Sequence, residues 1–127
     1  MPKLEHIAVS ANTERDSDRF FVELLGLDKT RAFSITAESA QKFFGVEREL
    51  RIVRYTNGRL DVEVIVTQDD SRAKDLFTHA CLVVEDRDTL ERRARSLGLR
   101  VIHVPKTGSD TYYLFIKDFF GNLYEIK

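Results

Sequence analysis

The stretch Leu4-Glu5-His6-Ile7-Ala8-Val9-Ser10 begins a pattern that this chain uses twice. It is a short apolar run between polar residues, which predicts a strand with His6 and Ala8 on one face. Phe77-Thr78-His79-Ala80-Cys81-Leu82-Val83-Val84 repeats the pattern, again with a His at the third position. The sequence therefore predicts an internal repeat, with one such strand opening each half.

The segments that follow the two opening strands are also alike. Each half reads as strand, helix and then two or three strands, with glycines after the helices and Asn57-Gly58 as a hairpin turn. The expected helices cover residues 13–25, 36–44 and 88–97, and the later strands cover 50–55, 60–66, 99–104, 112–116 and 123–126, with an apolar segment at 33–35.

A polar stretch separates the halves. It predicts a first module over residues 1–67, a linker over 68–76 and a second module over 77–127.

Composition limits the function of the chain. It has 127 residues and a mass of 14.7 kDa, which suits one small domain. Twenty basic against 21 acidic residues leave a net charge of −1, which disfavours nucleic acid as a partner. No apolar run reaches the length of about 20 residues that spans a membrane, and no signal-peptide pattern is present. With Cys81 as its single cysteine, the chain is expected to be a cytoplasmic protein without a disulfide.

The repeat also aligns the last strands of the two halves. Gly58-Arg59-Leu60-Asp61-Val62-Glu63 lies over Gly121-Asn122-Leu123-Tyr124-Glu125 with one residue of slack. Each half thus has a His in its first strand and a Glu in its last strand. Two imidazoles and two carboxylates suit a divalent first-row metal. Taken singly, however, a His in an apolar strand is more often structural, and a Glu on a strand usually faces solvent.

At this point the pattern resembles the vicinal oxygen chelate superfamily, which includes glyoxalase I, bleomycin-resistance proteins, fosfomycin-resistance enzymes, methylmalonyl-CoA epimerase and extradiol dioxygenases. The resemblance covers essentially the whole chain. The end of the chain looks like the family's motif, in which an acidic residue is followed by a turn, Gly-Asn and a Glu. Phe119 stands where Pro is common in the family. Besides the opening strands, the resemblance rests on Phe20-Phe21-Val22-Glu23-Leu24-Leu25-Gly26-Leu27, Val62-Glu63-Val64 and Phe115-Ile116-Lys117-Asp118-Phe119-Phe120-Gly121-Asn122-Leu123-Tyr124-Glu125-Ile126.

The resemblance implies an α+β fold of two tandem βαβββ modules, whose curled mixed sheets surround a cleft. It implies that a divalent ion (Ni, Zn, Co, Mn or Fe) is held by four residues, as in the glyoxalase I quartet. Two of these, Glu125 first and Glu63 second, are the candidate catalytic bases for moving a proton next to a carbonyl. The implied metal ligands are His6, Glu63, His79 and Glu125.

The leading expectation is thus a glyoxalase-like lyase or isomerase acting on a small oxygen-bearing substrate. One alternative is an Fe(II) extradiol-type dioxygenase that uses His6, His79 and Glu125, although Glu63 would fill a position that oxygen needs. Another is a non-catalytic, bleomycin-resistance-like binding protein.

Further residues are candidates for binding the substrate. Arg51 and Arg54 lie three apart in one strand and face opposite ways, so one of them at most faces a cleft; an inward Arg54 would suit an anionic substrate. Tyr112 and His103 are the other candidates, as a hydrogen-bond donor and a proton carrier. A homodimer is expected, with a small-molecule substrate and neither nucleic acid nor membrane as a partner.

Overall fold

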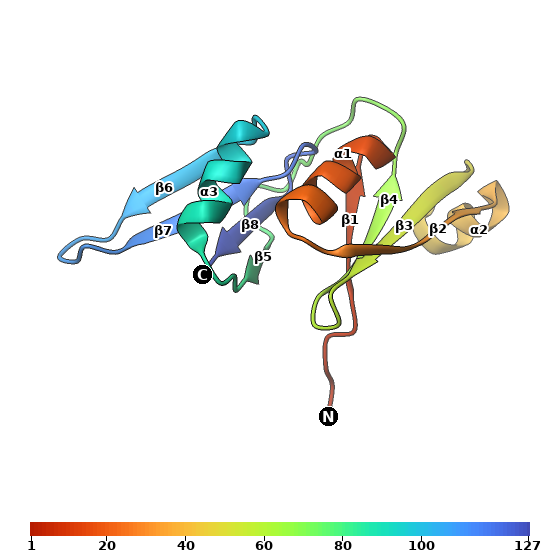
Figure 1. Cartoon of the computed structure of the whole chain (residues 1–127). Coiled ribbons are helices and arrows are strands. Elements are labelled where there is room, and N and C mark those ends of the chain that lie inside the picture. Colours follow the sequence, from red (N-terminus) through yellow and green to blue (C-terminus); the bar gives the residue numbers. More distant parts are fainter. The chain divides into compact units, whose positions relative to one another are not determined.

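The computed structural model describes residues 1–127 and divides the chain into two compact units, Met1–Ser71 and Arg72–Lys127 (Figure 1). We call them the first and the second module. None of their helices has both the length and the apolar character that crossing a bilayer requires.

The first module is built on a four-stranded mixed sheet in the order β1-β4-β3-β2, with β1 parallel to β4 and the other pairs antiparallel. A helical segment follows β1, and a short extra helix, α2, connects β2 to β3 (Figure 1). The elements are β1 (Ile7–Ala11), α1 (Glu14–Asp18), η1 (Arg19–Leu24), β2 (Asp28–Ile35), α2 (Ala37–Phe44), β3 (Leu50–Thr56) and β4 (Asp61–Val66).

The second module repeats this plan without the extra helix. Its sheet has the order β5-β8-β7-β6, and its first and last strands again pair in parallel. The elements are β5 (His79–Leu82), α3 (Arg87–Ser96), β6 (Val101–Pro105), β7 (Tyr112–Lys117) and β8 (Leu123–Ile126). The same connectivity and strand order in both modules confirm the predicted α+β class and the tandem repeat.

One face of each sheet is apolar and covered by helix. In the first module, Val62 and Val64 of β4 are buried together with Phe20 and Phe21 of η1, and Phe21 stacks on Tyr55 with a centroid distance of 5.3 Å. In the second, the buried residues of β7 and β8 alternate with residues that are, apart from exposed Tyr113, partly exposed, as expected of strands with one covered face. That buried set is Leu114, Ile116, Tyr124 and Ile126, with Leu90 and Ala94 of α3.

The first helical segment differs from the expected α-helix over residues 13–25. Thr13 caps its start, as predicted, by accepting a hydrogen bond from the Asp16 amide at 3.0 Å. After Asp18 the helix widens to π geometry, in which the Leu25 amide donates to the Phe20 carbonyl at 3.1 Å. The segment buries Phe20, Phe21 and Leu24 on the face that it turns to the sheet.

The strand bounds differ most at the strands that open each module and at β2. The strands expected from Leu4 and Phe77 begin at Ile7 and at His79. The strand β2 begins at Asp28, well before the apolar segment at 33–35, and its first half is exposed. It is an edge strand, and charged side chains are common on such edges because they prevent further pairing. Because the first half of β2 is polar, the apolar pattern of the sequence did not indicate a strand there.

Candidate metal centre

The open face of the first sheet carries one predicted ligand at its centre. In the register of the strands, Ala8 of β1 and Arg54 of β3 both lie opposite Glu63 of β4. These three residues therefore share the face opposite to buried Val62 and Val64. The side chains of Glu63 and Arg54 are 18% and 26% exposed. The other arginine, Arg51, lies on the helix side and pairs with Glu14 of α1 at 2.8 Å.

Three contacts connect His6, which immediately precedes β1, to Glu63. His6 Nδ1 lies 2.6 Å from Oε2 of Glu5. The other oxygen of Glu5 lies 3.8 Å from Nη1 of Arg54, whose Nε donates to Oε2 of Glu63 at 3.1 Å. The contact with His6 is the main cause that lowers the pKa of Glu5. Both predicted ligands of the first module thus belong to one chain of polar contacts.

The contact of His6 determines which of its ring nitrogens is available. A carboxylate only accepts hydrogen bonds, so Nδ1 of His6 must carry the proton that it shares with Glu5. In the neutral ring, Nε2 then keeps its lone pair. A metal-binding His is usually oriented in this way, by a carboxylate or a carbonyl on its other nitrogen.

The second module presents the same arrangement with different partners. His79 Nδ1 lies 2.8 Å from the Phe77 carbonyl oxygen, so its Nε2 is again the available nitrogen. Cys81 and Phe115 lie opposite Glu125, and Cys81 Sγ donates to Oε2 of Glu125 at 3.5 Å. Burial is the first cause that raises the pKa of the Cys81 thiol, and its bond to Glu125 is the second.

The strand register makes the two modules equivalent at the predicted ligands. In each, the residue two positions after the His lies directly opposite the Glu: Ala8 opposite Glu63, and Cys81 opposite Glu125. The one residue of slack in the sequence comparison therefore disappears at the glutamates. Neither module alone brings three or more metal-binding side chains into a cluster.

A half-buried turn positions Glu125. The carboxylate of Asp118 accepts hydrogen bonds from the amides of Phe120, Gly121 and Asn122 at 2.9 to 3.0 Å. It also accepts from the Asn122 side chain at 2.8 Å and from the Tyr124 hydroxyl at 3.0 Å. Burial raises the pKa of Asp118, against the effect of these donors. The acidic residue and Gly-Asn of the sequence pattern thus fix where β8 begins.

The other predicted substrate residues, Tyr112 and His103, lie on the helix side of the second sheet. Tyr112 donates to Asp88 of α3 at 2.8 Å, and His103 lies 3.1 Å from Glu91 of the same helix. Their rings are stacked with a centroid distance of 3.8 Å. They do not share a face with Glu125; Tyr113, the next residue, does. Because side chains alternate along a strand, Tyr113 lies on the same face as Phe115, and this alternation would have selected Tyr113 from the sequence.

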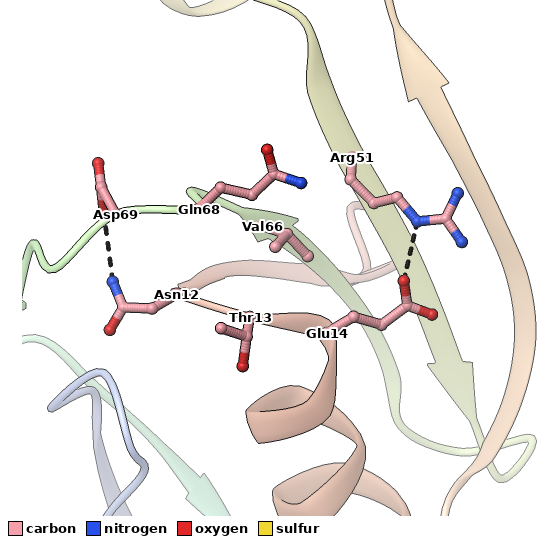
Figure 2. A pocket seen from close by; sticks show the side chains of 7 residues that line it. All are labelled: Asn12, Thr13, Glu14, Arg51, Val66, Gln68 and Asp69. Atoms are coloured by element: carbon pink, nitrogen blue, oxygen red, sulfur yellow. Dashed lines mark hydrogen bonds and ion pairs between the residues drawn. The ribbon is translucent and has the colours of Figure 1, made fainter.

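The first module also has a pocket of about 550 Å³ at the ends of β1 and β4 (Figure 2). In it the Asn12 side chain donates to Asp69 at 3.4 Å, and Arg51 pairs with Glu14. None of the predicted metal ligands lines it, so it is separate from the candidate centre. The lining residues are Asn12, Thr13, Glu14, Arg51, Val66, Gln68 and Asp69.

The chain is similar to known proteins over its full length. The model of the Glyoxalase/Bleomycin resistance protein/Dioxygenase superfamily matches residues 3–126. A glyoxalase family protein from Bacillus cereus is 17% identical, with a TM-score of 0.76, covering 99% of this chain and 93% of that one. The fosfomycin resistance protein FosX from Listeria monocytogenes is 14% identical, with a TM-score of 0.72, covering 99% and 92%.

A variant of the same Listeria protein, 13% identical with a TM-score of 0.72 and covering 99% and 89%, is complexed with Mn(II) and 1S,2S-dihydroxypropylphosphonic acid. No curated protein is significantly similar to the chain in sequence. At these identities the likeness to solved structures concerns the fold.

Proposed function

The chain belongs to the Glyoxalase/Bleomycin resistance protein/Dioxygenase superfamily, and from this premise we propose that it is a metal-dependent lyase or isomerase. Its divalent ion would be held by two residues of each module. These are His6 and Glu63 of the first module and His79 and Glu125 of the second.

The main support for the proposal is that the His and the Glu are arranged alike in the two modules. Each His has its Nδ1 engaged by an acceptor, Glu5 or the Phe77 carbonyl, which leaves Nε2 for a metal. Each Glu occupies the equivalent place in the strand register. Two neutral imidazoles and two carboxylates fit a divalent first-row ion such as Mn, Fe, Co, Ni or Zn.

The proposed chemistry moves two protons within the substrate, one bound to carbon and one to oxygen. When bound, the metal would polarise two oxygens of the substrate. Glu125 would take the proton from the hydroxyl-bearing carbon next to a carbonyl and return it to the carbonyl carbon, while the hydroxyl proton passes to the former carbonyl oxygen, which isomerises the substrate without an outside reactant. Glu125 is preferred over Glu63 because a guanidinium already holds Glu63, whereas only a thiol, a weaker donor, contacts Glu125.

The proposal includes a small-molecule substrate, a homodimer and a cytoplasmic location. We expect light scattering of the purified protein to give twice the chain mass. A monomer would remove the homodimer from the proposal and leave the chemistry unaffected.

Metal content tests the centre, and the three histidines provide their own control. We expect one divalent ion per chain by mass spectrometry of the purified protein. His6→Ala and His79→Ala should lose it, whereas His103→Ala, which changes a ring bound to Glu91, should retain it. Metal-free protein, or loss in all three variants, would contradict the proposed ligands.

The reaction class needs a second experiment. Loaded protein in D2O should exchange the hydrogen next to a carbonyl in a panel of hydroxyketones and hydroxyaldehydes. Oxygen uptake with catechols would instead indicate the dioxygenase. Modification of fosfomycin would instead indicate an activity related to the resistance for which the FosX proteins are named. Ligand binding that is unchanged in His6→Ala, with no turnover, would indicate a binding protein.

A further inference from the structure

We infer that Glu5 and Arg54 are positioning residues that join His6 to Glu63 and hold both as one polar unit. We call the four residues the ligand relay. The sequence pattern passed over Glu5, and it selected Arg54 for binding the substrate. For its effect on metal binding this inference rests on the proposed function, whereas the relay itself can be tested without metal.

The relay uses both oxygens of Glu5 and two nitrogens of Arg54. Glu5 accepts from His6 through Oε2 and faces Arg54 through Oε1. Arg54 directs Nη1 towards Glu5 and Nε towards Glu63. With two carboxylates against its guanidinium, Arg54 is poorly placed to bind an anionic substrate. Its contacts instead favour a role in orienting Glu63.

The solvent exposure of the side chains shows which contacts of the relay are strong. The bond between Arg54 and Glu63 joins side chains that are 26% and 18% exposed, so water screens it only in part. Glu5 is 70% exposed, and its 3.8 Å approach to Arg54 is the weak link. The expected result is firm orientation of Glu63 by Arg54, weaker orientation of His6 by the exposed Glu5, and modest coupling between the two.

The relay would orient His6 and Glu63 for binding a cation. It sets the tautomer of His6 and leaves Oε1 of Glu63 without the guanidinium. Two carboxylates, one guanidinium and a neutral imidazole carry a net charge of −1, which attracts a divalent ion. Residues of this kind around metal ligands typically change metal affinity about 10- to 100-fold when they are mutated.

The second module has no counterpart of the relay. Phe115 stands opposite Glu125, where Arg54 stands opposite Glu63. A backbone carbonyl takes the place of Glu5 at His79. The two halves of the proposed site are therefore held by different means, and only in the first half do charged side chains contact both predicted ligands.

The first test uses metal-free protein at a pH where His6 is neutral. The 15N shifts of the His6 ring should show the proton on Nδ1, and Glu5→Ala should return it to Nε2, the nitrogen that carries it in free histidine. His79 should keep its proton on Nδ1 in both proteins. A proton on Nε2 of His6 in the unmodified chain would overturn the relay, whatever the metal result.

The second test measures the affinity for Mn²⁺ and Zn²⁺ by calorimetry. Glu5→Ala and Arg54→Gln should each weaken binding by about 10-fold. The double variant should lose less than the product of the two losses. Arg51→Gln is the matched control, because Arg51 lies in the same strand with an ion pair at 2.8 Å, but on the helix side. It should change the affinity by less than about twofold.

The two tests separate the inference from the proposed function. Equal affinities for the unmodified chain, Glu5→Ala and Arg54→Gln would overturn the positioning role. If the unmodified chain binds neither Mn²⁺ nor Zn²⁺, the proposed function fails for these ions, and the tautomer of His6 alone decides the relay.

Discussion

Asp118 is the residue on which the position of Glu125 depends most directly. It accepts five hydrogen bonds, three of them from consecutive backbone amides. Asp118→Ala would leave these donors without partners at a half-buried turn. We expect the free energy of unfolding to fall by about 3 kcal/mol, measured by urea denaturation. Asp110→Ala, in an exposed loop, should change it by less than about 0.5 kcal/mol.

Glu125 and Glu63 should differ in their effect on turnover. Glu125→Gln removes the proposed base and should lower kcat by about 10²- to 10⁴-fold. Glu63→Gln should cost less, because Glu63 is proposed to act as a ligand only. Rates are compared in samples with equal metal content, since either change also removes a charged ligand. Equal kcat for Glu125→Gln and the unmodified chain would assign the base elsewhere.

At the residue scale, the sequence predicted the types of residue at the proposed site, but not every side chain that lies on each face of a sheet. Alternation placed Arg51 and Arg54 on opposite faces, yet only the register showed that Arg54 meets Glu63. The sequence selected Tyr112 as a candidate, whereas Tyr113 is the residue that shares a face with Glu125. Glu5 could not be recognised, because its role depends on contact with Arg54, which is distant in the chain.

Among the elements, α1 is attached to the sheet through the carboxylates of Glu14 and Asp18, the latter accepting from the Tyr55 hydroxyl at 2.7 Å. Glu14 pairs with Arg51 of β3 at 2.8 Å and with Lys29 of β2. These partners, Arg51 first, lower the pKa of Glu14 from its ordinary 4.5. The ionised form is therefore stabilised by folding, so the contribution is present above pH 4.5 and is lost as pH falls through the folded-state pKa.

Glu14→Gln tests this attachment. The variant should be about 1 kcal/mol less stable at pH 7, since the pair is partly exposed. The difference should shrink as the pH falls below about 4.5, which thermal unfolding at several pH values would show. Glu38→Gln, which breaks an exposed pair with Lys42, should cost less than 0.5 kcal/mol at pH 7. A pH-independent deficit in Glu14→Gln would exclude the charge as its cause.

Element types were predictable where local signals were strong. Thr13 and Thr36 cap helices as their residue type suggests, and Gly45 ends α2 in the left-handed region at φ 71°. The π turn of η1 has no such local signal, because it accompanies packing against Tyr55 of a distant strand. The edge strand β2 could not be predicted from apolar periodicity, because its first half is polar and exposed.

For the whole molecule, the proposed metal should stabilise both modules together. At a metal concentration 100 times its Kd, binding would add roughly 2.7 kcal/mol, which raises Tm by roughly 8 °C. His6→Ala and His79→Ala should each abolish the increase, although they lie in different modules. His103→Ala should keep it. An increase that survives either of the first two changes would mean that one module holds the metal alone.

The repeat was the part of the whole molecule most visible in the sequence. Apolar patterning predicted two halves of strand, helix and two or three strands, the family resemblance implied two βαβββ modules, and the strand orders agree. The exact equivalence at Glu63 and Glu125 needed the register, because the loops before β4 and β8 differ in length.

The parallel pairing of first and last strands has a consequence for folding. The residues facing Glu63 and Glu125 lie about 55 and 44 residues earlier in the chain. Contacts that close such long loops form slowly and late. Each His therefore meets the strand of its Glu only when its module is nearly complete. A metal ion would bind the finished modules and would not serve as the nucleus around which the chain folds.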